Sequence, residues 1–248
     1  MATATMKEVT LQIPDPKSNL LLSMLEPDDY SALMTPSRVI LLKLGKRLYR
    51  QDEPVDAVYF PLTCMVSLLA TSDGNDPELE MAAIGNEGVV GASEVLHSQG
   101  ALGLFQIQIP GAALRVPAPE FLDVVRARRA MMELFNLHLH ALTRKILQGA
   151  ACNHLHTISE RCARWILASQ DRAGSDTFPM TQEFLSHMLG VRRATVNHAI
   201  GSLKRDRLIS FVRGKMTVIN RQGLEAASCG CQETVKHQST AVMRHGLL

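Results

Sequence analysis

The segment LGVRRATVNHAI, residues 189–200, carries side chains that suit hydrogen bonding to nucleic-acid bases. Arginine donates a pair of hydrogen bonds to the O6 and N7 atoms of guanine, and asparagine pairs in a similar way with adenine. Histidine donates to a base acceptor or to a phosphate oxygen. On a helix that begins just before them, Arg193, Asn197 and His198 share one exposed face. This spacing predicts a helix that reads base edges in the major groove of DNA.

A second group of residues suits the phosphate backbone. Residues 190–221 hold eight Lys and Arg residues against one acid, Asp206, which gives this segment a net charge of +7, whereas the whole chain carries +2. Phosphate contacts set the register of a protein on DNA and supply much of its salt-dependent affinity. The candidates lie along the predicted helix and in the turn that follows it: Arg192, Thr195, Lys204, Arg205, Arg213 and Lys215.

The sequence around these residues predicts the elements that must position them. Thr181 can cap a short helix, and Gly190 permits a left-handed turn at its end. A second helix, expected over residues 192–205, has one apolar stripe for burial. This stripe consists of Val196, Ala199, Ile200 and Leu203. LISFV, RGK and MTVIN follow as strand, tight turn and strand, so the segment predicts a winged helix-turn-helix.

The N-terminal half of the chain has a different pattern. Between Arg38 and Val116, short β segments alternate with glycine-containing turns, which predicts a small antiparallel barrel or roll. After Pro119, apolar residues recur at alternating spacings of three and four, and we expect a long helix from about Ala127 to His154.

This long helix has two apolar rows. We assign one row to a homodimer interface: Met132, Phe135, Leu139, Leu142 and Ile146. The second row, Leu134, Leu137 and Ala141, would then pack on the chain's own domain. An internal core helix without a dimer is the alternative.

A β-roll, a long helix, the segment TQEFLSHMLGVRRATVNHAIGSLKRDRLIS and a basic hairpin occur in this order over residues 20–222. This arrangement resembles the Crp/Fnr transcription regulators. The resemblance implies a homodimer on palindromic DNA, with one recognition helix per half-site and an effector in the roll. It also implies that Arg193 takes the place of a guanine-reading arginine. Ala194 and His198 stand where many members carry an acid and a second arginine, so we expect a different operator.

The same resemblance places an effector pocket in the segment IGNEGVVGASEVL, with Gly85, Glu87, Gly91 and Ala92 as candidates. Ala92 stands where cyclic-nucleotide-binding members have a ribose-binding glutamate, and HSQGALGLFQ has no cation for the phosphate. A buried phosphodiester would be left without a positive partner. We therefore do not expect cyclic AMP, and the roll would hold an apolar or neutral ligand, or none.

The cysteines do not predict a cofactor. The iron–sulfur cluster of the Fnr branch needs about four thiolates grouped near the N-terminus, and none precedes Cys64. Five scattered cysteines do not suggest a disulfide framework, so we expect reduced thiols. The residues with some potential as metal ligands form two separate groups, Cys229, Cys231 and His237 in one and Cys152 and His156 in the other.

A metal or a thiol switch at Cys229 and Cys231 competes with the interpretation of a disordered tail, and a metal or haem at Cys152 and His156 competes with packed or solvated side chains. We assign no metal site and expect no cofactor.

These observations predict an α+β protein: a flexible N-terminus (1–19), a β-roll effector-type domain (20–118), a dimerisation helix and hinge (119–156), a winged helix-turn-helix domain (157–224) and a disordered tail (225–248). The N-terminus lacks a signal-peptide pattern, and no stretch approaches the roughly 18 apolar residues that span a bilayer, so we expect a cytoplasmic protein without a membrane partner.

The expected function is sequence-specific transcription regulation. The expected partners are double-stranded DNA and a second copy of the chain, with RNA polymerase as a further candidate. A ligand sensor whose C-terminal module contacts protein is the alternative. No nucleophile, base and orienting group occur in a recognised arrangement, so we expect no enzyme activity.

Overall fold

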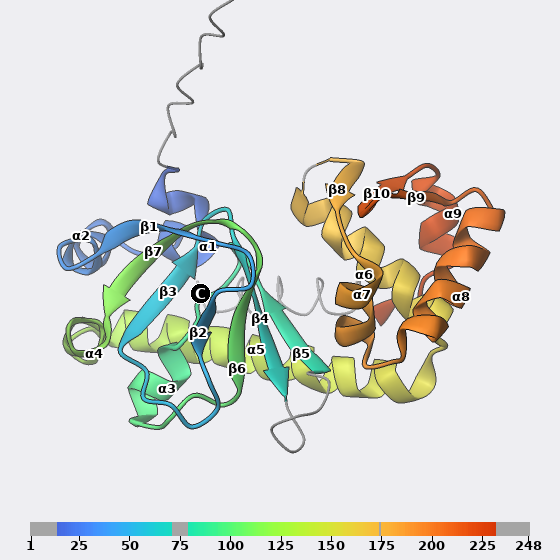
Figure 1. Cartoon of the computed structure of the whole chain (residues 1–248). Coiled ribbons are helices and arrows are strands. Elements are labelled where there is room, and N and C mark those ends of the chain that lie inside the picture. Colours follow the sequence, from blue (N-terminus) through green and yellow to red (C-terminus); the bar gives the residue numbers. More distant parts are fainter. Residues whose placement is uncertain (1–13, 71–78, 174, 232–248) are drawn as a thin grey trace, which may run out of the picture.

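The computed structural model describes residues 14–70, 79–173 and 175–231. The chain forms two bodies that are joined by one long helix, α5, which runs beneath both (Figure 1). We call the N-terminal body the roll (residues 38–117) and the C-terminal body the head (residues 158–226). The mixed helix and sheet content confirms the predicted α+β class. No described helix is long and apolar enough to cross a membrane.

The roll is built from two antiparallel sheets, as the sequence predicted. The first sheet has the order β1 (Arg38–Leu42), β7 (Gly111–Pro117) and β3 (Ala57–Pro61). The second has the order β2 (Arg47–Tyr49), β6 (Leu104–Ile109), β4 (Met65–Ala70) and β5 (Leu79–Ile84). Every residue of β3 is buried, because helices cover the outer face of its sheet.

Short helices close the roll: η1 (Pro16–Ser18), α1 (Leu20–Ser23), α2 (Pro27–Met34), α3 (Ala92–His97) and α4 (Ala118–Arg126). Asn19 caps α1 and is fully buried. Its Nδ2 donates hydrogen bonds of 2.9 Å to the carbonyl oxygens of Pro61 and Gly88. The expectation of a flexible N-terminus is therefore wrong for residues 14–19, since this buried amide ties them to the roll.

Helix α5 (Arg129–Leu155) is 27 residues long, which corresponds to about 40 Å. Phe135 on this helix is fully buried and lies 5.2 Å from Phe121 and 6.1 Å from Phe60, measured between ring centroids. Its assignment to a dimer interface is wrong, because its own chain encloses it. Leu142 and Ile146 are half-buried and pack against the core of the roll.

The head contains four helices and a three-stranded sheet: α6 (Ile158–Ala173), β8 (Thr177–Pro179), α7 (Gln182–Leu189), α8 (Arg193–Arg205), β9 (Ile209–Val212), β10 (Lys215–Val218) and α9 (Arg221–Ala226). β8 pairs with β10 and was not predicted. Thr157 and Glu160 cap α6 reciprocally: the backbone N–H of Thr157 donates to Glu160 Oε2 at 2.7 Å, and that of Glu160 to Thr157 Oγ1 at 3.4 Å.

Residues 227–231 follow α9 and bury Cys229 and Cys231, which are 4% and 6% exposed. The expectation of a disordered tail beginning at residue 225 is therefore wrong for residues 225–231. The rest of that predicted tail, including His237, lies outside the described residues.

Candidate nucleic-acid interface

The turn between α7 and α8 is fixed at both ends. The Thr181 hydroxyl accepts a hydrogen bond of 3.0 Å from the backbone N–H of Phe184, which confirms the predicted cap of α7. Gly190 ends α7 in the left-handed conformation, with φ of 63°. Arg161 on α6 donates from Nη2 to the carbonyl oxygen of Leu189 at 2.7 Å. This buried bond holds the turn against the first helix of the head.

Helix α8 has one buried face and one exposed face. Val196, Ala199, Ile200 and Leu203 are buried, as the sequence predicted. Arg193, Asn197 and His198 are exposed on the opposite side, and no described residue forms a hydrogen bond or an ion pair with their side chains. A row of donors and acceptors without intramolecular partners is available to an external ligand.

The start of α8 lacks a side-chain cap. Arg192 occupies the N-cap position with φ of −64° and ψ of 144°, and its side chain accepts no hydrogen bond from the helix. The first backbone N–H groups therefore keep their affinity for an anion such as a phosphate. Thr195, Lys204 and Arg205 are also exposed on this helix.

The predicted wing is a tight hairpin of β9 and β10, with Val212 opposite Lys215. Arg213 and Gly214 form the turn with φ of 48° and 75°. Both values are typical of a two-residue hairpin turn whose central residues are left-handed. Met216 anchors the hairpin because it is fully buried in the head. The side chains of Arg213 and Lys215 remain exposed at the tip.

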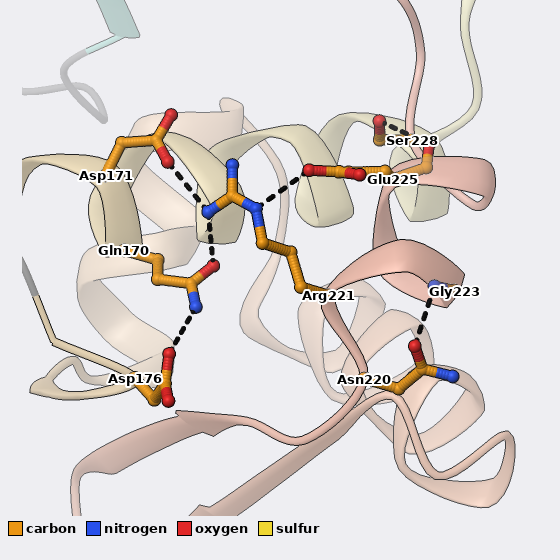
Figure 2. A network of polar contacts seen from close by, with 8 residues as sticks. All are labelled: Gln170, Asp171, Asp176, Asn220, Arg221, Gly223, Glu225 and Ser228. Atoms are coloured by element: carbon orange, nitrogen blue, oxygen red, sulfur yellow. Dashed lines mark hydrogen bonds and ion pairs between the residues drawn. The ribbon is translucent and has the colours of Figure 1, made fainter.

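Arg221, which contributed to the positive charge of this segment, has a structural role. Its Nη1 lies 2.8 Å from Asp171 Oδ1 and donates to Gln170 Oε1 at 2.9 Å, while its Nε lies 2.8 Å from Glu225 Oε1 (Figure 2). The hydrogen bond to Asp171 raises the pKa of Arg221. This network joins α9 to α6. The guanidinium group of Arg221 is engaged in these contacts, whereas the exposed side chains of Arg193, Asn197 and His198 on α8 are not engaged in this way.

The four predicted effector residues do not form one pocket. Gly91 and Ala92 line a small cavity of about 90 Å³ between the roll and α5, together with Leu139, Leu142 and Ile146. Glu87 lies on a different cavity and pairs with Lys145 Nζ at 3.2 Å. Gly85 donates from its backbone to Glu87 Oε2 at 3.1 Å. The sequence could not separate these residues because they lie within eight positions of one another.

The larger cavity, of about 540 Å³, lies where the roll, α5 and the head meet. Its lining includes Met81 and Ala83 on β5, Lys145 on α5 and Trp165 on α6. A volume in this range can hold a small organic molecule. The sequence did not predict this cavity, since its walls come from three parts of the chain.

A group of thiols and one imidazole meets where α5 ends. Cys152 Sγ lies 3.5 Å from Cys229 Sγ, and His156 Nδ1 lies 3.6 Å from Cys231 Sγ. All four ligand atoms lie within 4.8 Å of one another. The hydrogen bond with Cys152 lowers the pKa of Cys229 to about 5 and raises that of Cys152. We call Cys152, His156, Cys229 and Cys231 the thiol cluster.

Comparison with known proteins agrees with this geometry. Residues 160–227 match the family described as a Crp-like helix-turn-helix domain. FixK2 from Bradyrhizobium japonicum has a similar structure, with a TM-score of 0.67 and 17% identity over 78% of this chain and 98% of that chain. A Crp/Fnr-family regulator from Thermus thermophilus gives a TM-score of 0.64 and 19% identity over 77% and 98% of the two chains. The chain has the Crp/Fnr fold.

A third solved structure with this fold is the c-di-GMP-responsive regulator CLP from Xanthomonas campestris, at a TM-score of 0.65 and 13% identity over 78% of this chain and 99% of that chain. No curated protein matches the sequence. The residues that match the Crp-like family include α8 and the β9–β10 hairpin, so the resemblance stated from the sequence is confirmed.

Proposed function

We propose that this protein is a sequence-specific, homodimeric transcription regulator in which α8 enters the major groove of its operator. The exposed row of Arg193, Asn197 and His198, on a helix whose other face is fully engaged in the core, is the observation that supports this role most directly. In this proposal Arg193 donates to guanine and Asn197 pairs with adenine, while His198 donates to a base or phosphate.

The remaining basic residues contact the backbone in this proposal. Arg192 and Thr195 lie at the start of α8, Lys204 and Arg205 at its end, and Arg213 and Lys215 at the tip of the wing. These positions lie at both ends of α8 and in the wing, so their contacts with phosphates would fix the register of α8 without reading sequence. The affinity that they supply falls as salt concentration rises.

The dimer in this proposal uses the exposed face of α5. Residues at alternating spacings of four and three are exposed along the helix: Asn136, His140, Thr143, Leu147, Ala150 and His154. Leu147 is 63% exposed, and its face is rotated by about 80° from the apolar row assigned from the sequence. Met132, Leu139, Leu142 and Ile146 are half-buried at the edge of this face and stay predicted contacts.

A charge substitution at the centre of this face tests the dimer. We expect Leu147→Glu to give a monomer by size-exclusion chromatography with light scattering at a concentration where the wild type is a dimer. Leu41→Glu is the control, because Leu41 is similarly exposed, at 60%, but lies on β1 of the roll. A dimer that survives Leu147→Glu would rule out this face.

The smaller cavity limits the effectors that we propose for it. This cavity, of about 90 Å³, is lined by apolar side chains, Ser93, Thr143 and the buried carboxyl group of Glu94, whose pKa is raised by desolvation. Its described lining contains no Lys or Arg, so it suits a neutral or apolar ligand better than a cyclic nucleotide. RNA polymerase stays a predicted partner to which we assign no surface.

Selection of bound sequences from a random duplex pool, at two salt concentrations, tests the proposed function. We expect enrichment of a palindrome whose half-site centres lie about one helical turn apart. Weak binding without salt dependence and without an enriched motif would contradict the proposal. That result would favour the alternative, a ligand sensor whose head contacts protein.

A further inference from the structure

The thiol cluster brings together residues from two parts of the chain that are far apart in sequence. Cys152 lies in the last turn of α5, and His156 is the residue that ends this helix. Cys229 and Cys231 follow α9, so 77 positions separate Cys152 from Cys229. The cluster therefore joins the hinge between α5 and α6 to the far end of the head.

The side chains of the cluster are shielded from solvent. Cys152, Cys229 and Cys231 are 1%, 4% and 6% exposed, and together they form a small buried group of their own. His156 is half-buried, and its Nδ1 faces Cys231 Sγ. The backbone N–H of His156 donates to the carbonyl oxygen of Cys152 at 3.2 Å, which fixes the spacing of these two residues at the helix end.

We propose that the thiol cluster binds a single zinc ion through Cys152, His156, Cys229 and Cys231. Three cysteines and one histidine are a common ligand set of structural zinc sites, which are tetrahedral. With Zn–S bonds of about 2.3 Å, two ligand sulfur atoms of a tetrahedral site lie about 3.8 Å apart. The distance of 3.5 Å between Cys152 Sγ and Cys229 Sγ is close to this spacing, as is the distance of 3.6 Å between His156 Nδ1 and Cys231 Sγ. The four ligand atoms all lie within 4.8 Å of one another.

The same spacing favours one ion over an iron–sulfur cluster. In a [4Fe–4S] cluster each thiolate binds a different iron, and in a [2Fe–2S] cluster the four ligands bind in pairs to two irons, so ligand atoms on different irons lie farther apart than in a mononuclear site. A disulfide between Cys152 and Cys229 is the other alternative, and it would need a sulfur–sulfur distance of about 2.05 Å in place of 3.5 Å.

Charged and polar neighbours fit a negatively charged centre. Three thiolates and Zn²⁺ carry a net charge of −1, and both Arg161 and Arg164 interact electrostatically with Cys152 and Cys229. The Nε atoms of these two arginines are buried, and neither of these two Nε atoms has a hydrogen-bond partner among the described residues. Gln148 Nε2 donates to Cys231 Sγ at 3.2 Å, as a residue that supports a metal ligand would.

The zinc ion would close the long loop between Cys152 and Cys229 and clamp the head onto the end of α5. Because the unfolded chain does not hold these four ligands together, the free energy of zinc binding would add to the stability of the folded chain. The site thus has a structural role that is separate from the DNA contacts of α8, and the proposal stands whether or not the operator prediction holds.

Metal analysis of the full-length protein, purified with a mild reductant and without chelators, tests the proposal. We expect about one zinc ion per chain, as in other closed sites with four protein ligands. Reconstitution of the metal-free protein with Co²⁺ should give the charge-transfer and ligand-field bands of tetrahedral cobalt with thiolate ligands, because cobalt reports the geometry that colourless zinc hides.

Four variants sharpen this test. Cys229→Ser should abolish stoichiometric zinc, and His156→Ala should change the ligand-field bands of cobalt while the thiolate charge-transfer band remains. Gln148→Ala should keep the ion but weaken its binding by about 10-fold to 100-fold. Cys64→Ala is the control, because Cys64 is also a buried thiol but lies in the core of the roll, and its zinc content should equal that of the wild type.

Three results would overturn the proposal. The first is a reduced, folded wild-type protein that binds neither zinc nor cobalt through thiolates. The second is iron and sulfide with the visible absorption of a cluster. The third is a Cys152–Cys229 disulfide in protein isolated without reductant, with no metal bound. Circular dichroism of each variant separates the loss of a ligand from a failure to fold.

Discussion

The Nε2 atom of His138 accepts a hydrogen bond from the backbone N–H of Val89 at 3.4 Å, in the middle of the contact between α5 and the roll. His138 is 5% exposed, and a Cβ atom at Gly88 would approach its Cε1 to 2.7 Å. The glycine-containing loop therefore admits an imidazole ring into the interior. Desolvation lowers the pKa of His138 from 6.5 to about 4 despite the nearby carboxylate of Glu87, and Lys145 adds to this effect.

This buried imidazole predicts acid sensitivity. Below pH 6.5 the unfolded chain binds a proton at His138, whereas the folded chain resists protonation down to about pH 4. Stability should therefore fall as pH decreases through this window, by up to about 1.4 kcal/mol per pH unit. Urea unfolding at pH 7 and pH 5 measures the slope. It should flatten in His138→Gln and persist in His140→Gln, since His140 is exposed. Equal slopes in both variants would contradict the assignment.

A base contact by Arg193 predicts a loss of specificity. Arg193→Ala should weaken binding to the selected operator by about 1–3 kcal/mol and relax discrimination at one base pair in each half-site. Fluorescence anisotropy with the operator and with single-base variants measures both quantities. Unchanged affinity and unchanged base preference would show that α8 does not dock as proposed.

The wing predicts a different behaviour. Lys215 lies at the tip of the β9–β10 hairpin and not on α8, which we propose to read bases. Lys215→Ala should weaken binding to all duplexes by a similar factor and reduce the slope of log affinity against log salt by about one. The same anisotropy titration at several salt concentrations gives the slope. A sequence-dependent effect would instead place Lys215 on a base.

Two glycines of the head predict opposite effects on stability. Gly190 has a φ of 63°, and a Cβ atom there would come within 2.6 Å of Leu79 Cδ1, so Gly190→Ala should lower the free energy of unfolding by at least about 1–2 kcal/mol. Gly201 lies within α8, and its Cβ would meet only Arg205 Nη1 at 3.7 Å. Gly201→Ala should raise stability by about 0.5–1 kcal/mol. Thermal unfolding of both variants checks the signs.

The network around Arg221 predicts a stability effect without a direct effect on specificity. Arg221→Ala removes contacts with Gln170, Asp171 and Glu225, but the side chain of Arg221 is 43% exposed, so solvent reduces their contribution. We expect a loss of about 1–2 kcal/mol in urea unfolding. Gln222→Ala is the control on the same helix, because Gln222 is exposed and makes no described contact of this kind. An unchanged urea midpoint in Arg221→Ala would show that the network adds nothing.

The parts of the fold that depend on local sequence were predictable. The cap at Thr181, the turn at Gly190 and the stripe of α8 from Val196 to Leu203 each depend on residues within a few positions. Such signals survive in a single sequence because a helix repeats its contacts every three or four residues. The exposed face of α8 with Arg193, Asn197 and His198 followed from the same periodicity.

The parts that depend on distant contacts were not predictable in this way. Phe135 fitted an interface row on α5, but Phe60 and Phe121 from the roll and α4 enclose it. In the sequence, the residues of the thiol cluster formed two separate weak motifs. Cys152 and His156 come close to Cys229 and Cys231 only when the head has folded back onto the end of α5. The spacing of residues along the chain carries no information on such long-range contacts.

The contact between Gly190 and Leu79 also limits how the head of this protein can be replaced by the head of another protein. The turn of the head lies against the first residue of β5, so the roll and the head are shaped to each other at this point. A head taken from a relative with a side chain at the turn would collide with this leucine. Exchange of heads between proteins of this fold, in evolution or in a designed chimera, therefore requires a matched change in the roll when the new head has a side chain at this position.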